Sequence, residues 1–259
     1  MPPLGGEGKT LRHGGRRNHN REMKTRICVS TYGKTLEELV KSIKEITKRY
    51  GNILVEARVD YLEEDINAGT LAERLKPYAE RLVITVRPAE EGGYYTRGED
   101  KRLLLIRRLA LIQPAYIDVE LNKIDNSLIQ NIRNLGVKVI VSWHDFRKTP
   151  PRRDLTEVAK RAINLGDVAK VVTMSRGVED NLNILYLYSM LDHRRLIAFC
   201  MGEQGRVTRI LSATAGAPII YAATPDKKTA PGQYSVDEIL DILKWPICSA
   251  GAPTYEGEK

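Results

Sequence analysis

Residues 166–175, GDVAKVVTMS, combine the pattern of a buried strand with a lysine at its centre. Ala169 and Val171 are typical of a buried strand, and Gly166 ahead of them is typical of a turn. Lys170 lies in the middle of this apolar run, where an unpaired ammonium would cost several kcal/mol. The stretch therefore predicts a strand whose lysine faces a polar interior that uses or compensates its charge.

Strand-like runs of this kind alternate with helical patterns along the whole chain. The strand-like runs are RICVS (26–30), NILVEARVD (52–60), RLVITVR (81–87), YIDVEL (116–121), VKVIVSWHD (137–145), VAKVVTM (168–174), RLIAFCM (195–201) and APIIYA (217–222). The helical stretches cover 35–50, 70–80, 99–112, 127–136, 154–166, 179–191, 204–216 and 235–245. Eight strand–helix units in series predict an α/β fold, the (β/α)8 TIM barrel.

Helix signals agree with this division of the chain. Thr35 and Asp154 are expected to be N-caps, and Gly136 and Gly166 are expected to end helices. A doubly wound open sheet is the alternative fold, but no GxGxxG motif follows the first strand.

The length of 259 residues suits one barrel domain. We expect a single catalytic domain over 23–245, a disordered basic extension over 1–22 and a C-terminal tail over 246–259. The extension has five basic residues against two acidic ones, so it carries +3 of the net charge of +8, and it has little apolar surface to bury. A nucleic-acid-binding arm is an alternative interpretation, although this uneven charge distribution argues against a nucleic-acid partner.

The sequence gives no sign of a membrane or an oxidising compartment. It lacks a run of about 18 apolar residues and an N-terminal secretory core. Cys28, Cys200 and Cys248 lie far apart without a CxxC motif. We therefore expect a cytoplasmic protein with no membrane partner, and the lack of a His, Cys and Asp cluster argues against a metal.

Side chains on a strand alternate between two faces, and this parity predicts which residues face the barrel interior. One face of each strand is apolar and is expected to contact the outer helices, whereas the other face is largely polar. The predicted inward residues are Glu56, Arg58, Asp60, Thr85, Arg87, Asp118, Glu120, Ser142, His144 and Lys170. Most lie near the C-terminal ends of the strands, where barrel active sites are built.

Lys170 and His144 are the residue types that covalent catalysis on a carbonyl group requires. A lysine in a desolvated, cation-rich pocket loses proton affinity, and its free amine forms a Schiff base with a ketone or aldehyde. His144, the one histidine on a predicted strand, is suited to take and return protons because its ordinary pKa is close to working pH. Arg58, Arg87 and Arg209 are suited to bind an anionic substrate.

A structural alternative is an ion-pair network that fills the barrel interior. In that interpretation Glu56, Arg58, Asp118 and Lys170 only satisfy one another's charges. It does not explain why His144 faces the same interior.

At this point six motifs in the chain resemble the type I 3-dehydroquinate dehydratases, over about residues 26–243. The motifs are Glu56-Ala-Arg58, VRPAEEGG (86–93), SWHDF (142–146), AKVVTM (169–174), MGEQGRVTR (201–209) and TAPGQ (229–233). Each is weak alone, but their order on eight strand–helix units makes the resemblance specific.

The resemblance implies a barrel that converts 3-dehydroquinate to 3-dehydroshikimate in the shikimate pathway, with no metal or organic cofactor and as a homodimer. It gives Lys170 the Schiff base, His144 the acid–base steps with syn loss of water, and Glu91 the carboxylate that holds and tunes the histidine. The positions that match substrate-binding residues are Ser30, Glu56, Arg58, Arg87, Thr229, Arg209 and Gln233, the last two at the substrate carboxylate, with Met201 and Tyr221 as apolar walls.

The chain departs from the family pattern without losing a reacting group. Phe199 stands where many members have a second methionine, and Tyr221 stands where phenylalanine is usual. Thr208 and Thr229 replace frequent serines. There is no room between Met23 and the first strand for the N-terminal hairpin of many bacterial members, so we expect a compact form.

Two other functions are open at this stage. A class I Schiff-base aldolase would share Lys170, but its phosphate site should be a Gly-rich turn after strands seven and eight. A non-catalytic basic binder would act through residues 1–22, and its binding should be salt-sensitive. The loop over 225–233 combines Gly, two prolines and Gln, which predicts either a lid over bound substrate or a plain connection.

Overall fold

The computed structural model describes residues 25–224, 230 and 232–244. The predicted extension over 1–22 and tail over 246–259 therefore lie outside the described residues. The same holds for Thr229 and for most of the predicted lid.

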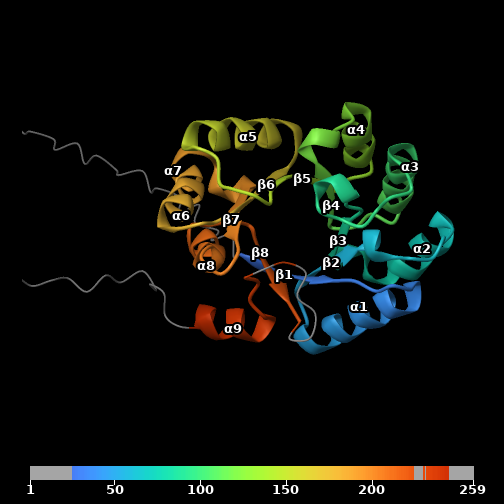
Figure 1. Cartoon of the computed structure of the whole chain (residues 1–259). Helices are drawn as coiled ribbons and strands as arrows, with labels where there is room; N and C mark the ends of the chain where they lie inside the picture. Colours follow the sequence, from blue (N-terminus) through green and yellow to red (C-terminus); the bar gives the residue numbers. More distant parts are fainter. Residues whose placement is uncertain (1–24, 225–229, 231, 245–259) are drawn as a thin grey trace, which may run out of the picture.

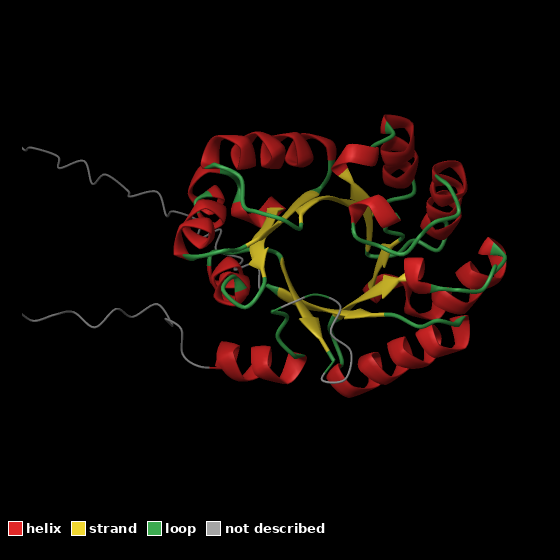
Figure 2. Cartoon of the chain, in the orientation of Figure 1, coloured by secondary structure: helices red, strands yellow, loops and turns green. Residues whose placement is uncertain are grey.

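Eight parallel strands form a nearly closed barrel. They are β1 (Arg26–Thr31), β2 (Leu54–Arg58), β3 (Leu82–Thr85), β4 (Tyr116–Glu120), β5 (Lys138–Asp145), β6 (Val168–Met174), β7 (Leu196–Met201) and β8 (Ile219–Ala223). The hydrogen-bonded order is β7-β6-β5-β4-β3-β2-β1-β8, and within the described residues no ladder joins β7 to β8. Figure 2 shows the strands as a ring with the helices outside it. This arrangement confirms the predicted (β/α)8 barrel.

The helices follow the strands in the expected alternation (Figure 1). They are α1 (Leu36–Tyr50), α2 (Ala68–Leu75), α3 (Glu99–Ala110), α4 (Asn126–Asn134), α5 (Arg152–Leu165), α6 (Val178–Leu185), α7 (Leu187–Met190), α8 (Arg206–Thr214) and α9 (Val236–Lys244). Short 3-10 turns are η1 (Val59–Tyr61), η2 (Lys76–Arg81), η3 (Ala89–Glu91), η4 (Leu121–Lys123) and η5 (His193–Arg195).

One of the two predicted N-caps is confirmed. The Thr35 hydroxyl accepts the backbone N–H of Glu38 at 3.2 Å and caps α1. The prediction for Asp154 is wrong, because α5 begins at Arg152 with Pro151 as its N-cap. Proline restricts the backbone there, so the helix begins two residues before Asp154. Asp154 therefore lies in the first turn, where its negative charge interacts favourably with the helix dipole.

Both predicted helix stops are confirmed, and one predicted helix is shorter than expected. Gly166 caps α5, and Gly136 follows the end of α4 with a φ of 78° that favours glycine. The stretch 70–80 does not form one helix: α2 ends at Leu75, and Pro77 lies in the 3-10 turn η2. Proline lacks the backbone N–H that an α-helix needs for its hydrogen bonds, so the α-helix ends before Pro77 and a 3-10 turn follows.

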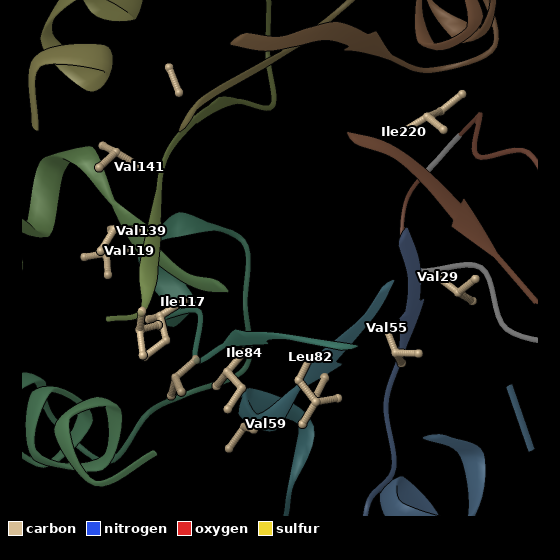
Figure 3. Close-up of a cluster of buried hydrophobic side chains, with 14 of the residues drawn as sticks. Val29, Val55, Val59, Leu82, Ile84, Ile117, Val119, Val139, Val141 and Ile220 are labelled. Carbon is tan, nitrogen blue, oxygen red and sulfur yellow. The ribbon is translucent and has the colours of Figure 1, made fainter. Parts of the chain in front are cut away.

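Apolar side chains form two layers, one between strands and helices and one inside the barrel. The outer layer includes the labelled residues of Figure 3, such as Val55, Ile117 and Val139. Complete burial of such a side chain stabilises the fold by about 1.5–3 kcal/mol. These residues have the outward parity that the sequence predicts.

The inner layer corrects part of the sequence prediction. Parity suggests a polar interior, but the floor of the barrel is apolar, and it continues into apolar side chains on β7 and β8. The apolar cluster inside the barrel contains Cys28, Leu54, Val83, Tyr116, Ile140, Val168, Val172, Ile197, Phe199, Met201, Ile219 and Tyr221. Apolar packing satisfies the closed end of the barrel, so polar side chains concentrate toward the C-terminal ends of β1 to β6.

Candidate active site

A cavity with an empty volume of about 540 Å³ lies at the C-terminal ends of the strands. It is lined by Ser30, Glu56, Arg58, Arg87, Gly92, His144, Phe146, Lys170, Val172, Phe199, Met201, Arg209, Tyr221, Ala230 and Gln233. Ten of these lining residues belong to the site predicted from the sequence. Of the other two predicted residues, Thr229 lies outside the described part, and Glu91 is buried without lining the cavity.

Lys170 is buried, and carboxylates compensate its charge. Its Nζ atom lies 3.0 Å from Oδ2 of Asp118 and 3.5 Å from Oε1 of Glu56. The face of the Tyr221 ring lies against the same ammonium, with 4.2 Å from Nζ to the ring centroid. The nearest charges are therefore acidic, which corrects the expectation of a cation-rich surrounding for this amine.

The two carboxylates that pair with Lys170 are themselves held in place. The Ser30 hydroxyl donates to Glu56 at 2.6 Å, and the Thr85 hydroxyl donates to the same carboxylate at 3.0 Å. Burial opposes ionisation of Glu56, but the charges of Lys170 and Arg58 outweigh burial and hold its pKa below the usual range. Glu56 is thus a fixed anion beneath the cavity.

Asp118 is the second fixed anion and has a wider set of partners. It accepts hydrogen bonds from Lys170, from Arg87 Nη2 at 3.1 Å and from the Ser142 hydroxyl. Burial opposes its ionisation, yet the Lys170 and Arg87 charges hold its pKa well below the usual range. Asp118 therefore links the lysine to the arginine that contacts His144.

His144 lies half-buried at the cavity, one layer above Lys170. In the β5–β6 ladder Lys170 is level with Ser142, and His144 is level with Val172. The backbone of His144 is thus two residues nearer the C-terminal end of the barrel than the backbone of Lys170, which corresponds to a rise of about 7 Å along the strand. The lysine side chain has four methylene groups and extends toward that layer, so both groups reach the same cavity.

The imidazole has a defined partner in Arg87. Arg87 Nη1 lies 2.8 Å from His144 Nδ1, and a guanidinium can only donate. Nδ1 is therefore the acceptor, and the proton of the neutral ring is on Nε2. Burial, followed by the charges of Arg87 and Lys170, lowers the pKa of His144 well below its usual value. The free site holds a neutral imidazole, whereas the sequence suggested an ordinary histidine pKa.

The turn after β3 supports the ring of His144 from the other side. Phe146 stacks on His144 with 5.7 Å between ring centroids and 10° between planes. Gly92 lies against Phe146 at a φ of 74°, and a Cβ there would lie 2.4 Å from Cζ of the phenyl ring. Gly93 passes so close to the Arg87 carbonyl that a Cβ would lie 2.2 Å from its oxygen. Both glycines of the EEGG motif are needed for this packing.

These features can be compared with known proteins. A family model described as "Type I 3-dehydroquinase" matches residues 27–247. The chain belongs to the type I 3-dehydroquinase family. It is an enzyme of that family, which is the family that the six sequence motifs resemble.

Relatives with curated names agree with the 3-dehydroquinase assignment. A 3-dehydroquinate dehydratase of Pyrococcus abyssi is 38% identical over 211 residues, 81% of this chain and 94% of that protein. A 3-dehydroquinate dehydratase of Methanopyrus kandleri is 38% identical over 219 residues, 84% of this chain and 98% of that protein. These matches favour the 3-dehydroquinase over the aldolase interpretation.

Solved structures agree on the fold of the 3-dehydroquinase family. The 3-dehydroquinate dehydratase of Geobacillus kaustophilus covers 88% of this chain and 93% of its own, with a TM-score of 0.79 and 23% identity. A type I 3-dehydroquinate dehydratase of Clostridium difficile, solved with covalently modified comenic acid, covers 85% of this chain and 91% of its own. Its TM-score is 0.74 and its identity 27%.

In this 3-dehydroquinase the expected contact of Glu91 with the histidine is not present. Glu91 is buried in η3, and its Oε1 accepts a hydrogen bond from Asn122 Nδ2 at 2.9 Å. No hydrogen bond joins Glu91 to His144 in the described structure, because Arg87 occupies Nδ1. The role that the family resemblance gives Glu91, to hold and tune the histidine, therefore stays a prediction.

Arg58 is held by a residue that the sequence placed on the inward face without a role. Its Nε and Nη2 atoms donate to the two carboxylate oxygens of Asp60 at 2.9 and 2.7 Å. Asp60 also accepts the backbone N–H of Tyr94, which lies in the turn after β3. Asp60 therefore fixes the arginine and ties it to the EEGG turn.

The far side of the cavity combines one buried cation with apolar walls. The Arg209 guanidinium on α8 lies over the Phe199 ring at 4.2 Å, and burial lowers its pKa to about 10, so it remains charged. Gln233 Nε2 donates to the Ala222 carbonyl at 3.0 Å. Met201 and Tyr221 are buried beside them, as walls of the cavity.

Several lining residues were not predicted. Phe146 and Val172 belong to quoted motifs, but their apolar side chains gave no chemical signal. Gly92 contacts the cavity only because the turn brings its backbone there. Within the described residues no group of three His, Cys, Asp or Glu could hold a metal ion. No helix in that same part of the chain is long and apolar enough to cross a membrane.

Proposed function

We propose that this enzyme dehydrates 3-dehydroquinate to 3-dehydroshikimate, the shikimate-pathway reaction, through a Schiff base on Lys170. The observation that carries the proposal is the cavity itself. It brings the Lys170 amine, the His144 imidazole and three buried arginines to one site. The Clostridium difficile enzyme was solved with covalently modified comenic acid, which supports covalent chemistry in the family.

Formation of the Schiff base begins at the ion pair. The ammonium of Lys170 first gives up a proton to the neutral imidazole of His144, and the free amine then attacks the substrate ketone to form a carbinolamine. Loss of water from the carbinolamine gives an iminium, which draws electrons from the adjacent carbon and acidifies its C–H bond. Asp118 and Glu56 stabilise this cation as they stabilise the ammonium, because iminium and ammonium carry the same charge.

The elimination step is assigned to His144. The neutral imidazole takes the acidified proton, and the resulting imidazolium returns a proton to the departing hydroxyl, so that water is lost by syn elimination. Hydrolysis of the iminium then releases the product and restores the amine of Lys170.

The tautomer of His144 requires a rearrangement before it acts as a base. Nε2 carries the ring proton while Arg87 donates to Nδ1. We propose that bound substrate draws Arg87 away from Nδ1, so that the proton moves to Nδ1 and Nε2 becomes free to accept. Glu91, one residue before Gly92, is the nearby carboxylate that the family resemblance assigns to this Nδ1–H.

Substrate recognition is assigned to the arginines and the polar rim. Arg209 and Gln233 would bind the substrate carboxylate, and Arg58 and Arg87 would bind elsewhere on the anion. Ser30, Glu56 and Thr229 complete the proposed binding set, with Met201 and Tyr221 against the ring. The Arg209 guanidinium remains charged at this wall, and a charged guanidinium suits a carboxylate.

Borohydride trapping tests the mechanism. Incubation with 3-dehydroquinate and borohydride, followed by peptide mass mapping, should place a reduced ligand adduct on Lys170. Lys170→Ala should give no adduct, and His144→Ala should still trap some adduct while turnover falls by roughly 10²–10⁴-fold. The absence of any adduct in wild-type enzyme during turnover would contradict the mechanism.

From the family resemblance we also propose that the protein is a homodimer and that it is cytoplasmic. Side chains of Val178, Leu182 and Met190 are exposed on α6 and α7, and a second copy of the chain is the proposed occupant of this surface. Analytical ultracentrifugation of wild type and Leu182→Lys measures the oligomeric state. A monomeric wild type would contradict the proposed homodimer. We further propose that deletion of residues 1–22 leaves turnover unchanged.

A further inference from the structure

Tyr221 on β8 contributes a buried hydroxyl that the proposed steps do not use. Its ring lines the cavity and lies against Lys170 Nζ. Its Oη atom is buried and has no hydrogen-bond partner among the described residues. The sequence gave this residue the role of an apolar wall, a role that the usual phenylalanine fills without a hydroxyl.

A buried hydroxyl without a partner costs free energy, so its presence here needs a reason. A tyrosine hydroxyl on α7, in the helical shell, shows the ordinary arrangement. Tyr188 Oη accepts the Ala198 N–H at 2.7 Å and shares a hydrogen bond with the Ser212 hydroxyl. The contrast indicates that the partner of Tyr221 arrives with a ligand.

The position of the ring limits what that partner can be. Nζ of Lys170 lies over the ring face, 4.2 Å from its centroid. A carbon that bonds to Nζ brings its own substituents to within two bonds of that nitrogen, next to the same ring. The oxygen of a carbinolamine is the polar substituent on that carbon, and Tyr221 is a donor on the adjoining wall.

From this geometry we propose that Tyr221 is a further catalytic residue, whose hydroxyl hydrogen-bonds to the oxygen that leaves and re-enters at the carbon attached to Lys170. The proposal rests on the proposed Schiff base. When the carbinolamine collapses, its C–O bond breaks, the nitrogen lone pair forms the C=N bond, and a proton from the imidazolium of His144 completes the departing water. Tyr221 orients that oxygen and keeps its own proton throughout.

The surroundings of the phenol suit a donor that does not ionise. Burial, then the charges of Glu56, Cys28 and Asp118, raises the pKa of Tyr221 well above its usual value. The hydroxyl therefore keeps its hydrogen at neutral pH.

Tyr221→Phe tests the proposal, with Tyr188→Phe as the matched control that also removes one buried phenol hydroxyl. Exchange of the substrate ketone oxygen with ¹⁸O-water measures formation and hydrolysis of the carbinolamine apart from the elimination. Borohydride trapping in a single turnover measures the imine, steady-state kinetics measures kcat and KM, and thermal unfolding measures stability.

We expect Tyr221→Phe to slow oxygen exchange, trapping and kcat by about 10- to 100-fold with little change in KM. Its Tm should equal or exceed that of wild type, whereas Tyr188→Phe should lower Tm and keep kcat. Wild-type rates in Tyr221→Phe would overturn the role of the hydroxyl. A fall in Tm like that of Tyr188→Phe would make it structural and would also overturn the role. If wild type itself shows neither adduct nor exchange, the Schiff base is what fails.

Discussion

Lys170 Nζ lies 3.0 Å from Asp118 Oδ2, so a buried ammonium on β6 is paired with a buried carboxylate on β4. The same carboxylate accepts a hydrogen bond from Arg87, which contacts the imidazole of His144. Asp118 therefore connects the proposed nucleophile, Lys170, to the proposed acid–base group, His144, through Arg87. The ion-pair network expected as a structural alternative is present in part: Lys170 pairs with Asp118 and Glu56, whereas Arg58 pairs with Asp60.

Asp118→Asn should destabilise the protein and inactivate it. The change leaves the charges of Lys170 and Arg87 without their common anion, and uncompensated buried charges cost about 3–5 kcal/mol. We expect a loss of that size in the free energy of unfolding, measured with urea at neutral pH. Turnover should fall by roughly 10²-fold or more, because both cations lose their orientation.

Asp65→Asn is the matched control, since it removes a carboxylate from an exposed pair with Arg97. Exposed pairs contribute little, so both unfolding and turnover should match wild type. An Asp118→Asn protein as stable as this control would show that the buried pair does not support the site.

Glu120 should give the stability of the protein an unusual dependence on pH. It is buried on β4, and its Oε2 accepts a hydrogen bond from Arg102 Nη1 at 2.6 Å. Burial raises the pKa of Glu120 to about 6, although Arg87 and Arg102 oppose the change. A carboxyl with a higher pKa in the folded state lowers stability as pH rises from its unfolded value of about 4.3 toward 6, by about 2 kcal/mol.

Glu120→Gln removes that dependence, so the stability advantage of wild type over the variant should shrink by about 2 kcal/mol between pH 4 and pH 7. Urea unfolding at the two pH values measures this. Glu99→Gln is the control of opposite sign, because the hydrogen bond from Arg102 lowers the pKa of Glu99. The stability advantage of wild type over Glu99→Gln should grow between pH 4 and pH 7. If the advantage over both variants changed in the same direction, the assignment of the raised pKa to Glu120 would be contradicted.

The sequence predicted the barrel well because its signals are local. Alternation within each strand placed Glu56 and Lys170 inside and Val55 and Val171 outside, and the structure agrees. Parity carries no information about depth, however. Leu54 and Lys170 both face inward, and only the three-dimensional register shows that Leu54 lies in the apolar floor.

Contacts between distant residues were beyond sequence reasoning. Glu91 pairs with Asn122, which lies 31 residues further along the chain. Arg102 belongs to a charge-rich helix whose pattern suggests an exposed side chain, yet it is completely buried against Glu120. Such partners depend on where the turns and helices of neighbouring units dock, which no local pattern encodes.

Arg87→Gln should raise the pKa of His144. Burial is the first cause of its lowered pKa and the charge of Arg87 is the second, so removal of the guanidinium should move the value up and leave it below the usual range. NMR titration of ¹³C-labelled imidazole measures this. Arg107→Gln, a change in a surface pair with Asp125, is the control that should leave the titration unchanged. Equal titrations in both variants would contradict the electrostatic role of Arg87.

Gly92→Ala should disturb the support of the histidine ring. The residue has a φ of 74°, and an added Cβ would lie 2.4 Å from the Phe146 ring that stacks on His144. We expect a loss of about 1–2 kcal/mol from the backbone alone, a further loss from displacement of the phenyl ring, and a fall in kcat larger than the rise in KM.

Gly51→Ala separates these two causes. Gly51 has a similar φ of 67°, but nothing lies within 4 Å of its added Cβ. This control should therefore lose only the backbone contribution in urea unfolding, with kcat equal to that of wild type. If the two alanine variants lose the same stability and both keep full kcat, the packing of Phe146 does not position the imidazole. A loss of kcat in Gly92→Ala alone would instead show that the Phe146 ring, packed against Gly92, positions the imidazole for acid–base catalysis.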